Sequence, residues 1–181
     1  MKRSIVTAAV LSALFVSAGA FAADSEGAAE GELIITGKVV GTTCKFIDGN
    51  KAIIDMNEIG KDVLNRLSPG QAYTAYKNDT ITPLKVKCDN NEAPTITFST
   101  SQFDSVNKKV TRNTASQNGV GFVVLYDGNE IDPETGLKLT GNDKGEYTLN
   151  FSAQYARLAP LNTDVEQGPV ASSLTLTVVT D

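Results

Sequence analysis

The chain contains no histidine and no tryptophan, and it has only two cysteines among its 181 residues. Without histidine, Ser-His-Asp and Cys-His catalysis are excluded, and the commonest general base and metal ligand is missing. Two cysteines are too few soft ligands to build a metal site by themselves. The sequence therefore predicts neither a catalytic centre nor a cofactor or metal site.

Long apolar runs are also missing after the N-terminus. The run over residues 5–16 follows the basic start Lys2-Arg3 and leads into small residues that end in an Ala-x-Ala pattern at 20–22. This order predicts a secretory signal peptide over residues 1–22. A membrane anchor is the alternative, but a spanning helix needs about 20 apolar residues. We therefore expect an exported protein that is soluble outside the cytoplasm.

Basic residues are fewer than acidic ones, 16 against 21. Loss of Lys2 and Arg3 with the signal peptide leaves 14 basic against 21 acidic residues, a net charge of −7. An acidic chain has no electrostatic reason to bind nucleic acid or anionic lipid. In an oxidising compartment we expect Cys44 and Cys88 to form one disulfide, which would stabilise the fold by about 4 kcal/mol on the chain-entropy estimate.

The remaining residues carry the patterning of strands. β-branched and aromatic residues, mostly alternating with polar ones, predict strands over residues 32–40, 51–56, 80–88, 95–99, 119–126, 146–155 and 172–180. Turn-forming clusters separate them, and only residues 57–67 have apolar spacing that suggests a short helix. About seven strands in one domain suggest an immunoglobulin-like sandwich, although a true immunoglobulin domain has a tryptophan on its disulfide.

The residues around the cysteines resemble a known family. Residues 31–44 (GELIITGKVVGTTC) resemble the opening of bacterial fimbrial subunits of the chaperone-usher class, in which a glycine, an alternating strand and Gly-x-Val-Val precede a cysteine. Cys88 closes LKVKC at the spacing of the family's second cysteine, and residues 147–156 (YTLNFSAQYA) resemble its late strand. Gly168 stands where the family keeps a glycine before its last strand.

The resemblance implies an all-β, incomplete immunoglobulin-like β-sandwich that lacks its last strand. A periplasmic chaperone first fills the resulting groove, and the N-terminal extension of the next subunit then replaces it. The implied division is a signal peptide (1–22), a donor-strand extension (23–35) and a pilin domain (36–181). Every second residue of the donor would face inward, with Gly31 where the groove is tightest; these residues are Ala29, Gly31, Leu33 and Ile35. The alternative is that residues 23–31 form an idle disordered tail.

The last predicted strand places Leu174, Leu176 and Val178 on one face. Those residues could simply belong to a core strand. The resemblance implies instead that they and Gly168 line the groove and contact the chaperone, which grips the C-terminal carboxylate. The family usually has a tyrosine next to last, where this chain has Thr180.

The resemblance implies a structural, non-enzymatic fimbrial subunit that supports cell adhesion. Copies of the chain or related pilins would polymerise head to tail by donor-strand exchange, after export through the periplasm and an outer-membrane usher to the cell surface. The alternatives are a minor adaptor or adhesive subunit, or a self-contained secreted ligand-binding sandwich. Loop residues that could be imagined as an acid/base pair or calcium ligands are more typical of solvated turns; they are Asp127, Asn129, Asp132, Glu134 and Asp143.

Overall fold

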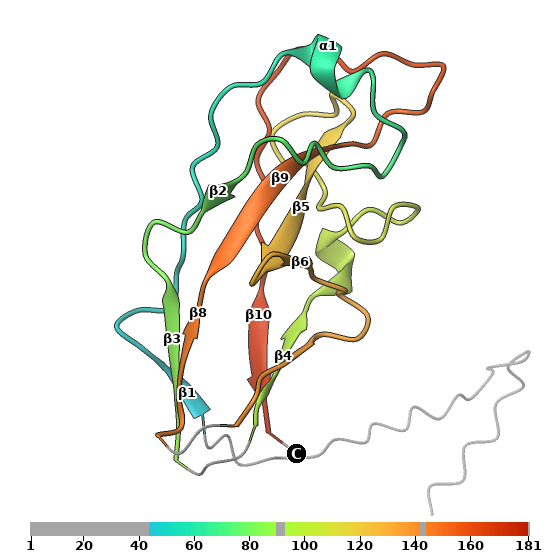
Figure 1. The fold of residues 1–181 in the computed structure, drawn as a ribbon. Helices are drawn as coiled ribbons and strands as arrows, with labels where there is room; N and C mark the ends of the chain where they lie inside the picture. The colour runs from blue at the N-terminus through green and yellow to red at the C-terminus, as the bar shows by residue number, and fades with distance from the viewer. Residues whose placement is uncertain (1–43, 90–92, 142–143, 181) are drawn as a thin grey trace, which may run out of the picture. The chain divides into compact units, whose positions relative to one another are not determined.

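The computed structural model describes residues 44–89, 93–141 and 144–180. These residues form antiparallel sheets in the orders β1-β3-β8, β10-β4-β7 and β2-β9-β5-β6 (Figure 1). The elements are β1 (Cys44–Ile47), α1 (Lys61–Leu64), β2 (Asn78–Asp79), β3 (Leu84–Cys88), β4 (Thr95–Phe98), the 3-10 turn η1 (Thr100–Gln102), β5 (Val120–Tyr126), β6 (Asn129–Glu130), β7 (Leu137–Lys138), β8 (Glu146–Leu149), β9 (Phe151–Arg157) and β10 (Leu176–Val179). The predicted all-β fold is confirmed.

Alternating sequence places one face of most strands in the core. In β3 the side chains of Leu84, Val86 and Cys88 are buried, whereas the intervening lysines point outward. Strands β4 and β8 alternate in the same way. Successive side chains of a strand point to opposite faces, so a period of two gives each of these strands one apolar and one solvated face.

Strands β5 and β9 are buried on both faces. They pair over seven residues each, from Val120 opposite Arg157 to Tyr126 opposite Phe151. The apolar run of β5 is continuous, which is typical of a strand covered on both sides. This ladder is therefore the centre of the fold.

The chain passes from β8 into β9 at Asn150 and changes sheet there. Strand β8 pairs with β3, whereas β9 pairs with β5 and β2. In Figure 1 the two strands follow one another along one continuous band. This passage joins two of the sheets through one chain segment.

The main core cluster draws side chains from all three sheets. Two smaller clusters lie on either face of the β5–β9 ladder. Among the described residues, the members of the main cluster are Leu84, Val86, Cys88, Ile96, Phe98, Phe103, Val124, Ile131, Leu139, Tyr147, Leu149 and Phe151.

Several predicted boundaries differ from the structure. Residues 51–56 are extended but join no ladder among the described strands, and the strand predicted over 172–180 is confined to β10. The strand predicted over 80–88 begins only at Leu84, after Pro83, because proline has no N–H to donate to a ladder. The helical spacing of 57–67 gives only the short α1. The predicted strand over 32–40 lies outside the described residues.

Candidate functional site

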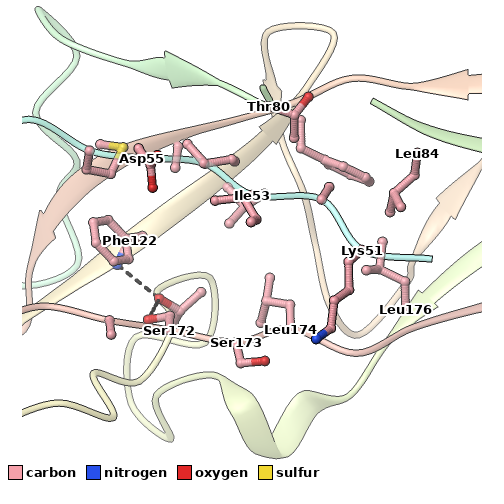
Figure 2. A pocket seen from close by; sticks show the side chains of 18 of the residues that line it. Lys51, Ile53, Asp55, Thr80, Leu84, Phe122, Ser172, Ser173, Leu174 and Leu176 are labelled. Atoms are coloured by element: carbon pink, nitrogen blue, oxygen red, sulfur yellow. Dashed lines mark hydrogen bonds between the residues drawn. The ribbon is translucent and has the colours of Figure 1, made fainter. Parts of the chain in front are cut away.

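An open groove lies between two extended segments of the chain. It has a volume of about 720 Å³, and its walls are residues 50–56 on one side and 170–176 on the other. Figure 2 shows the walls running in opposite directions, with Lys51 and Leu176 toward one end and Asp55 and Ser172 toward the other. The groove is open and is not a closed cavity, because Leu174 and Leu176 stay only partly buried.

The wall at 170–176 has backbone groups without partners. Ala171 and Thr175 direct their N–H and C=O groups away from the groove, toward residues 99–114. Backbone groups alternate between the two sides of an extended segment, so Ser172 and Leu174 direct theirs toward the groove. Within the described ranges, the backbone groups of Ser172 and Leu174 have no hydrogen-bond partner.

The wall at 50–56 has the same arrangement. The C=O of Ile53 accepts a hydrogen bond from the N–H of Ile81 at 3.0 Å, and the C=O of Asp55 accepts one from the Asn78 side chain. Both bonds lie on the side away from the groove. Ala52, Ile54 and Met56 therefore direct their backbone groups into it, over side chains that face inward and are partly buried.

The floor of the groove is apolar and aromatic. Phe122 lies opposite Tyr155 and Val124 opposite Ala153 in the β5–β9 ladder, so these four side chains share one face. The Phe122 and Tyr155 rings are 5.1 Å apart, and Phe151 packs between Phe98 and Tyr126 at 6.3 and 5.7 Å. The backbone groups that the two walls direct into the groove thus flank an apolar floor.

The groove floor holds one ionisable group with a shifted pKa. Burial raises the pKa of the Tyr155 phenol, with smaller contributions from Tyr76 and Glu58. Its hydroxyl donates a hydrogen bond of 2.9 Å to the C=O of Asn57, which ties the floor to the chain just beyond the 50–56 wall. Tyr155 therefore stays neutral and fixes the position of that wall.

A second hollow of about 610 Å³ continues the groove past Met56, Tyr155 and Val170. Its far side is formed by α1 and residues 165–169. The buried Arg157 guanidinium holds that side together, because all of its N–H donors bind backbone carbonyls of the surrounding loops; the acceptors are the C=O groups of Asn65, Leu67, Ala159, Pro160 and Thr163. The sequence analysis missed Arg157, because nothing local in the sequence names its partners.

The structure places the predicted site residues as follows. The disulfide between Cys44 and Cys88 is confirmed, with 3.9 Å between the Cα atoms of the paired strands β1 and β3. Leu174 and Leu176 line the groove, whereas Val178 packs on the core cluster next to it. Gly168 lies in the second hollow with φ +156°, and its C=O accepts a hydrogen bond from Asn118. The predicted donor residues Ala29, Gly31, Leu33 and Ile35 lie outside the described residues.

Asp127 and Asp132 take part in turns, and Asp143 lies outside the described residues. The side chain of Asp132 accepts a hydrogen bond of 2.9 Å from the N–H of Glu134, and Glu134 forms an exposed ion pair of 2.5 Å with Lys108. Asp127 adopts φ +47° in the turn between β5 and β6. No group of three metal-ligating side chains occurs in the part of the chain that the structure describes.

Comparison with known proteins gives a consistent set of matches. A family model described as fimbrial protein matches residues 33–179. The curated relatives include the fimbrial-like protein YehD of Escherichia coli K12, 29 % identical with full coverage of both chains. Another is the fimbrial-like protein SfmA of the same strain, 26 % identical over 86 % of this chain and 87 % of its own.

Two solved structures share the fold. A subunit from a chaperone-usher pilus matches with a TM-score of 0.56 and 14 % identity, over 88 % of this chain and 100 % of its own. The P pilus rod subunit PapA matches with the same TM-score and identity, over 77 % and 99 %. At this low identity the structural match shows a common fold alone. That fold confirms the predicted immunoglobulin-like sandwich.

Proposed function

The chain belongs to the fimbrial protein family, and on this premise we propose that its groove binds the N-terminal segment of a second copy. The chain is a structural subunit of a surface fimbrium and polymerises with other pilin subunits. The proposal adds the mechanism, which is donor-strand exchange. It also adds the assembly route. The subunit would pass through the periplasm with a chaperone in its groove, and the chaperone would be replaced at an outer-membrane usher by the N-terminal segment of the next subunit.

One observation carries the proposal. Ala52, Ile54 and Met56 on one wall, and Ser172 and Leu174 on the other, direct into the same apolar groove backbone groups that have no hydrogen-bond partner among the described residues. An added strand would hydrogen-bond to both rows and cover the floor, which is the physical basis of strand addition at a sheet edge. An ordinary ligand pocket needs only a few convergent polar groups, whereas this groove has backbone N–H and C=O groups along both walls.

Residues 23–35 supply a strand of suitable character. Leu33 and Ile35 are apolar and would lie on the inward face with Ala29 and Gly31. Burying Leu33 and Ile35 would contribute about 1.5–3 kcal/mol each. Because the donor of one subunit fills the groove of the next, the contact is heterologous and generates a filament.

The test uses chain 23–181 with a second copy of residues 29–39 appended after Asp181. A Gly/Ser linker of about 20 residues joins the two. Its mean span of about 25 Å allows the appended copy to insert in either direction. This is the appended-strand chain. Its thermal midpoint should exceed that of chain 23–181 by about 10 °C. The control carries Leu33→Asp and Ile35→Asp in the appended copy only. Equal midpoints in all three chains would refute strand binding in the groove.

The same chain tests the role proposed for Gly31. Gly31→Leu in the appended copy should remove most of the rise in midpoint, because a side chain would not fit under the neighbouring walls. Gly37 falls on the same face and provides the matched control as Gly37→Leu. Loss of the rise with Gly37→Leu alone would move the tightest point of the groove to residue 37 and contradict the assignment of Gly31.

A further inference from the structure

The outward face of the 50–56 wall carries a cation, an exposed apolar side chain and an anion in order. These are Lys51, Ile53 and Asp55, and all three are exposed, Ile53 by 60 %. In the described part of the chain, neither Lys51 nor Asp55 belongs to an ion pair. Figure 2 shows the Lys51 side chain pointing across the opening of the groove toward the wall that carries Leu174.

The N-terminal segment has the complementary order on its own outward face. If Leu33 and Ile35 face inward, the alternate residues face outward. In chain order these are Glu30, Glu32, Ile34, Thr36 and Lys38. Glu32 precedes Ile34 by two residues, as Lys51 precedes Ile53 on the wall, whereas the cation Lys38 follows Ile34 only after four residues.

The two orders match in one direction only. With Ile34 beside Ile53 and both segments running the same way, Glu32 lies beside Lys51, and Lys38 follows beyond Asp55. Running the opposite way, Glu32 lies beside Asp55, and like charges on neighbouring strands are destabilising. Ile34 covers the exposed Ile53 in either direction, so the charged side chains decide between the two.

We propose that Lys51 and Ile53 select the direction and register of the incoming strand by pairing with Glu32 and Ile34 of a second copy, while Asp55 disfavours the opposite direction by repelling Glu32. The proposal rests on the proposed function, because it specifies the occupant of the same groove. Contacts with the floor stabilise any strand whose apolar residues alternate with a period of two. The outward-facing side chains, in contrast, distinguish the correct register from one shifted by two residues. Lys51 and Ile53 are thus specificity-determining residues of strand exchange.

The direction has a geometric consequence. Residues 50–56 and β10 run in opposite directions (Figures 1 and 2), so the matching strand enters beside the end of β10. A linker of four residues, which reaches at most about 14 Å, is then long enough to append residues 29–39 after Asp181. The opposite direction would require a linker that spans the groove, about 23 Å for seven residues. This variant is the short-linker chain, and it should be as stable as the appended-strand chain.

Register is measured in the short-linker chain by disulfide trapping. Ile53→Cys is combined with Ile34→Cys, Glu30→Cys or Lys38→Cys in the appended copy, and cross-links are identified by mass in protease digests. Positions four residues apart differ by about 13 Å along a strand, so the pair 53–34 should cross-link at least about tenfold more than 53–30 or 53–38. Stronger cross-linking of either control pair would overturn the proposed register.

Charge selection is measured by reversal in the same chain. Lys51→Glu and Glu32→Lys, the latter in the appended copy, should each lower the thermal midpoint by about 2–4 °C, and the double variant should recover most of the loss. The differences should shrink in 0.5 M salt. Additive losses would show that the two side chains do not pair.

The outcomes separate the two proposals. If neither linker length stabilises the chain, the proposed binding of a strand in the groove is wrong. If the chain is stabilised but the cross-links or the charge reversal disagree, only the proposed match of the outward faces is wrong.

Discussion

Arg157 shows how one residue can hold several loops together. It is 2 % exposed, yet none of the described carboxylates pairs with it. A guanidinium has five N–H donors, and here each one has a backbone acceptor between 2.6 and 3.2 Å away. The residue therefore replaces its hydration shell with carbonyl groups from the turn after α1 and from the chain after β9.

Arg157→Met should destabilise chain 23–181 by about 3 kcal/mol, because five backbone carbonyl groups lose a charged donor. Urea unfolding at equilibrium, with the disulfide intact, measures the change. Arg112→Met is the matched control, since Arg112 is exposed and donates one bond of 2.8 Å to the C=O of Phe103. The control should lose less than about 1 kcal/mol. A similar loss in both variants would contradict the role given to Arg157.

Gly121 is required by close packing near the start of β5. A Cβ at this position would lie 2.2 Å from the C=O oxygen of Thr111 and 2.8 Å from a methyl group of Val110. Gly121→Ala should therefore cost about 3 kcal/mol or prevent folding. Gly60→Ala, where a Cβ would meet no atom within 4 Å, should cost less than about 1 kcal/mol. Comparable thermal midpoints for the two variants would show that β5 can shift to make room.

At the scale of elements, local pattern predicted the strands that alternate strictly or are apolar throughout. The buried rows of β3, β4, β5 and β8 could be located from sequence because each strand determines its own two faces. The limits of the strands around the groove could not. Whether residues 51–56 or 172–175 count as strand depends on a neighbour to hydrogen-bond with, and the sequence alone does not name it.

The candidate site was predicted in part for the same reason. The disulfide, Leu174 and Leu176 followed from spacing and resemblance, and the structure places the two leucines on the groove. The opposite wall and the contribution of Arg157 depend on contacts between residues about 90 to 120 positions apart in the chain, such as Asn65 with Arg157. Period-two alternation over residues 51–56 was the available signal for the wall, but it did not indicate its partner.

The disulfide joins two elements that already pair, β1 and β3. Replacing Cys44 and Cys88 together by serine should lower the free energy of unfolding by about 4 kcal/mol, because the unfolded chain gains the freedom of a loop of 44 residues. Urea unfolding of the double variant against the oxidised mature chain measures this loss. The oxidised chain before and after reduction is the control. A loss below about 1 kcal/mol would show that the strand pairing alone holds this end of the fold.

At the scale of the whole molecule, each subunit presents one groove and one N-terminal segment, and the proposed exchange joins them head to tail. The appended-strand chain has its groove filled and its own N-terminal segment free. Added to mature chain 23–181, it should cap one end of growing polymers and shorten them as its mole fraction rises. Unboiled denaturing gels should show shorter ladders, which boiling converts to single bands. The Leu33→Asp, Ile35→Asp control should leave the ladders unchanged, and equal shortening by the control would contradict capping through the groove.

The position of charge in the fold has a consequence for acid tolerance. Among the described residues, Arg157 is the buried charged group, and the carboxylates lie at least partly in solvent. Acid unfolding depends mainly on carboxylates that must take up protons when the native structure opens and on histidines that are buried neutral. Histidine is missing from the chain, and no carboxylate is buried among the described residues, so protonation finds few groups through which to loosen the described core. A fibre built from such subunits would keep its strength in acidic surroundings, because the described core contains neither a histidine nor a buried carboxylate.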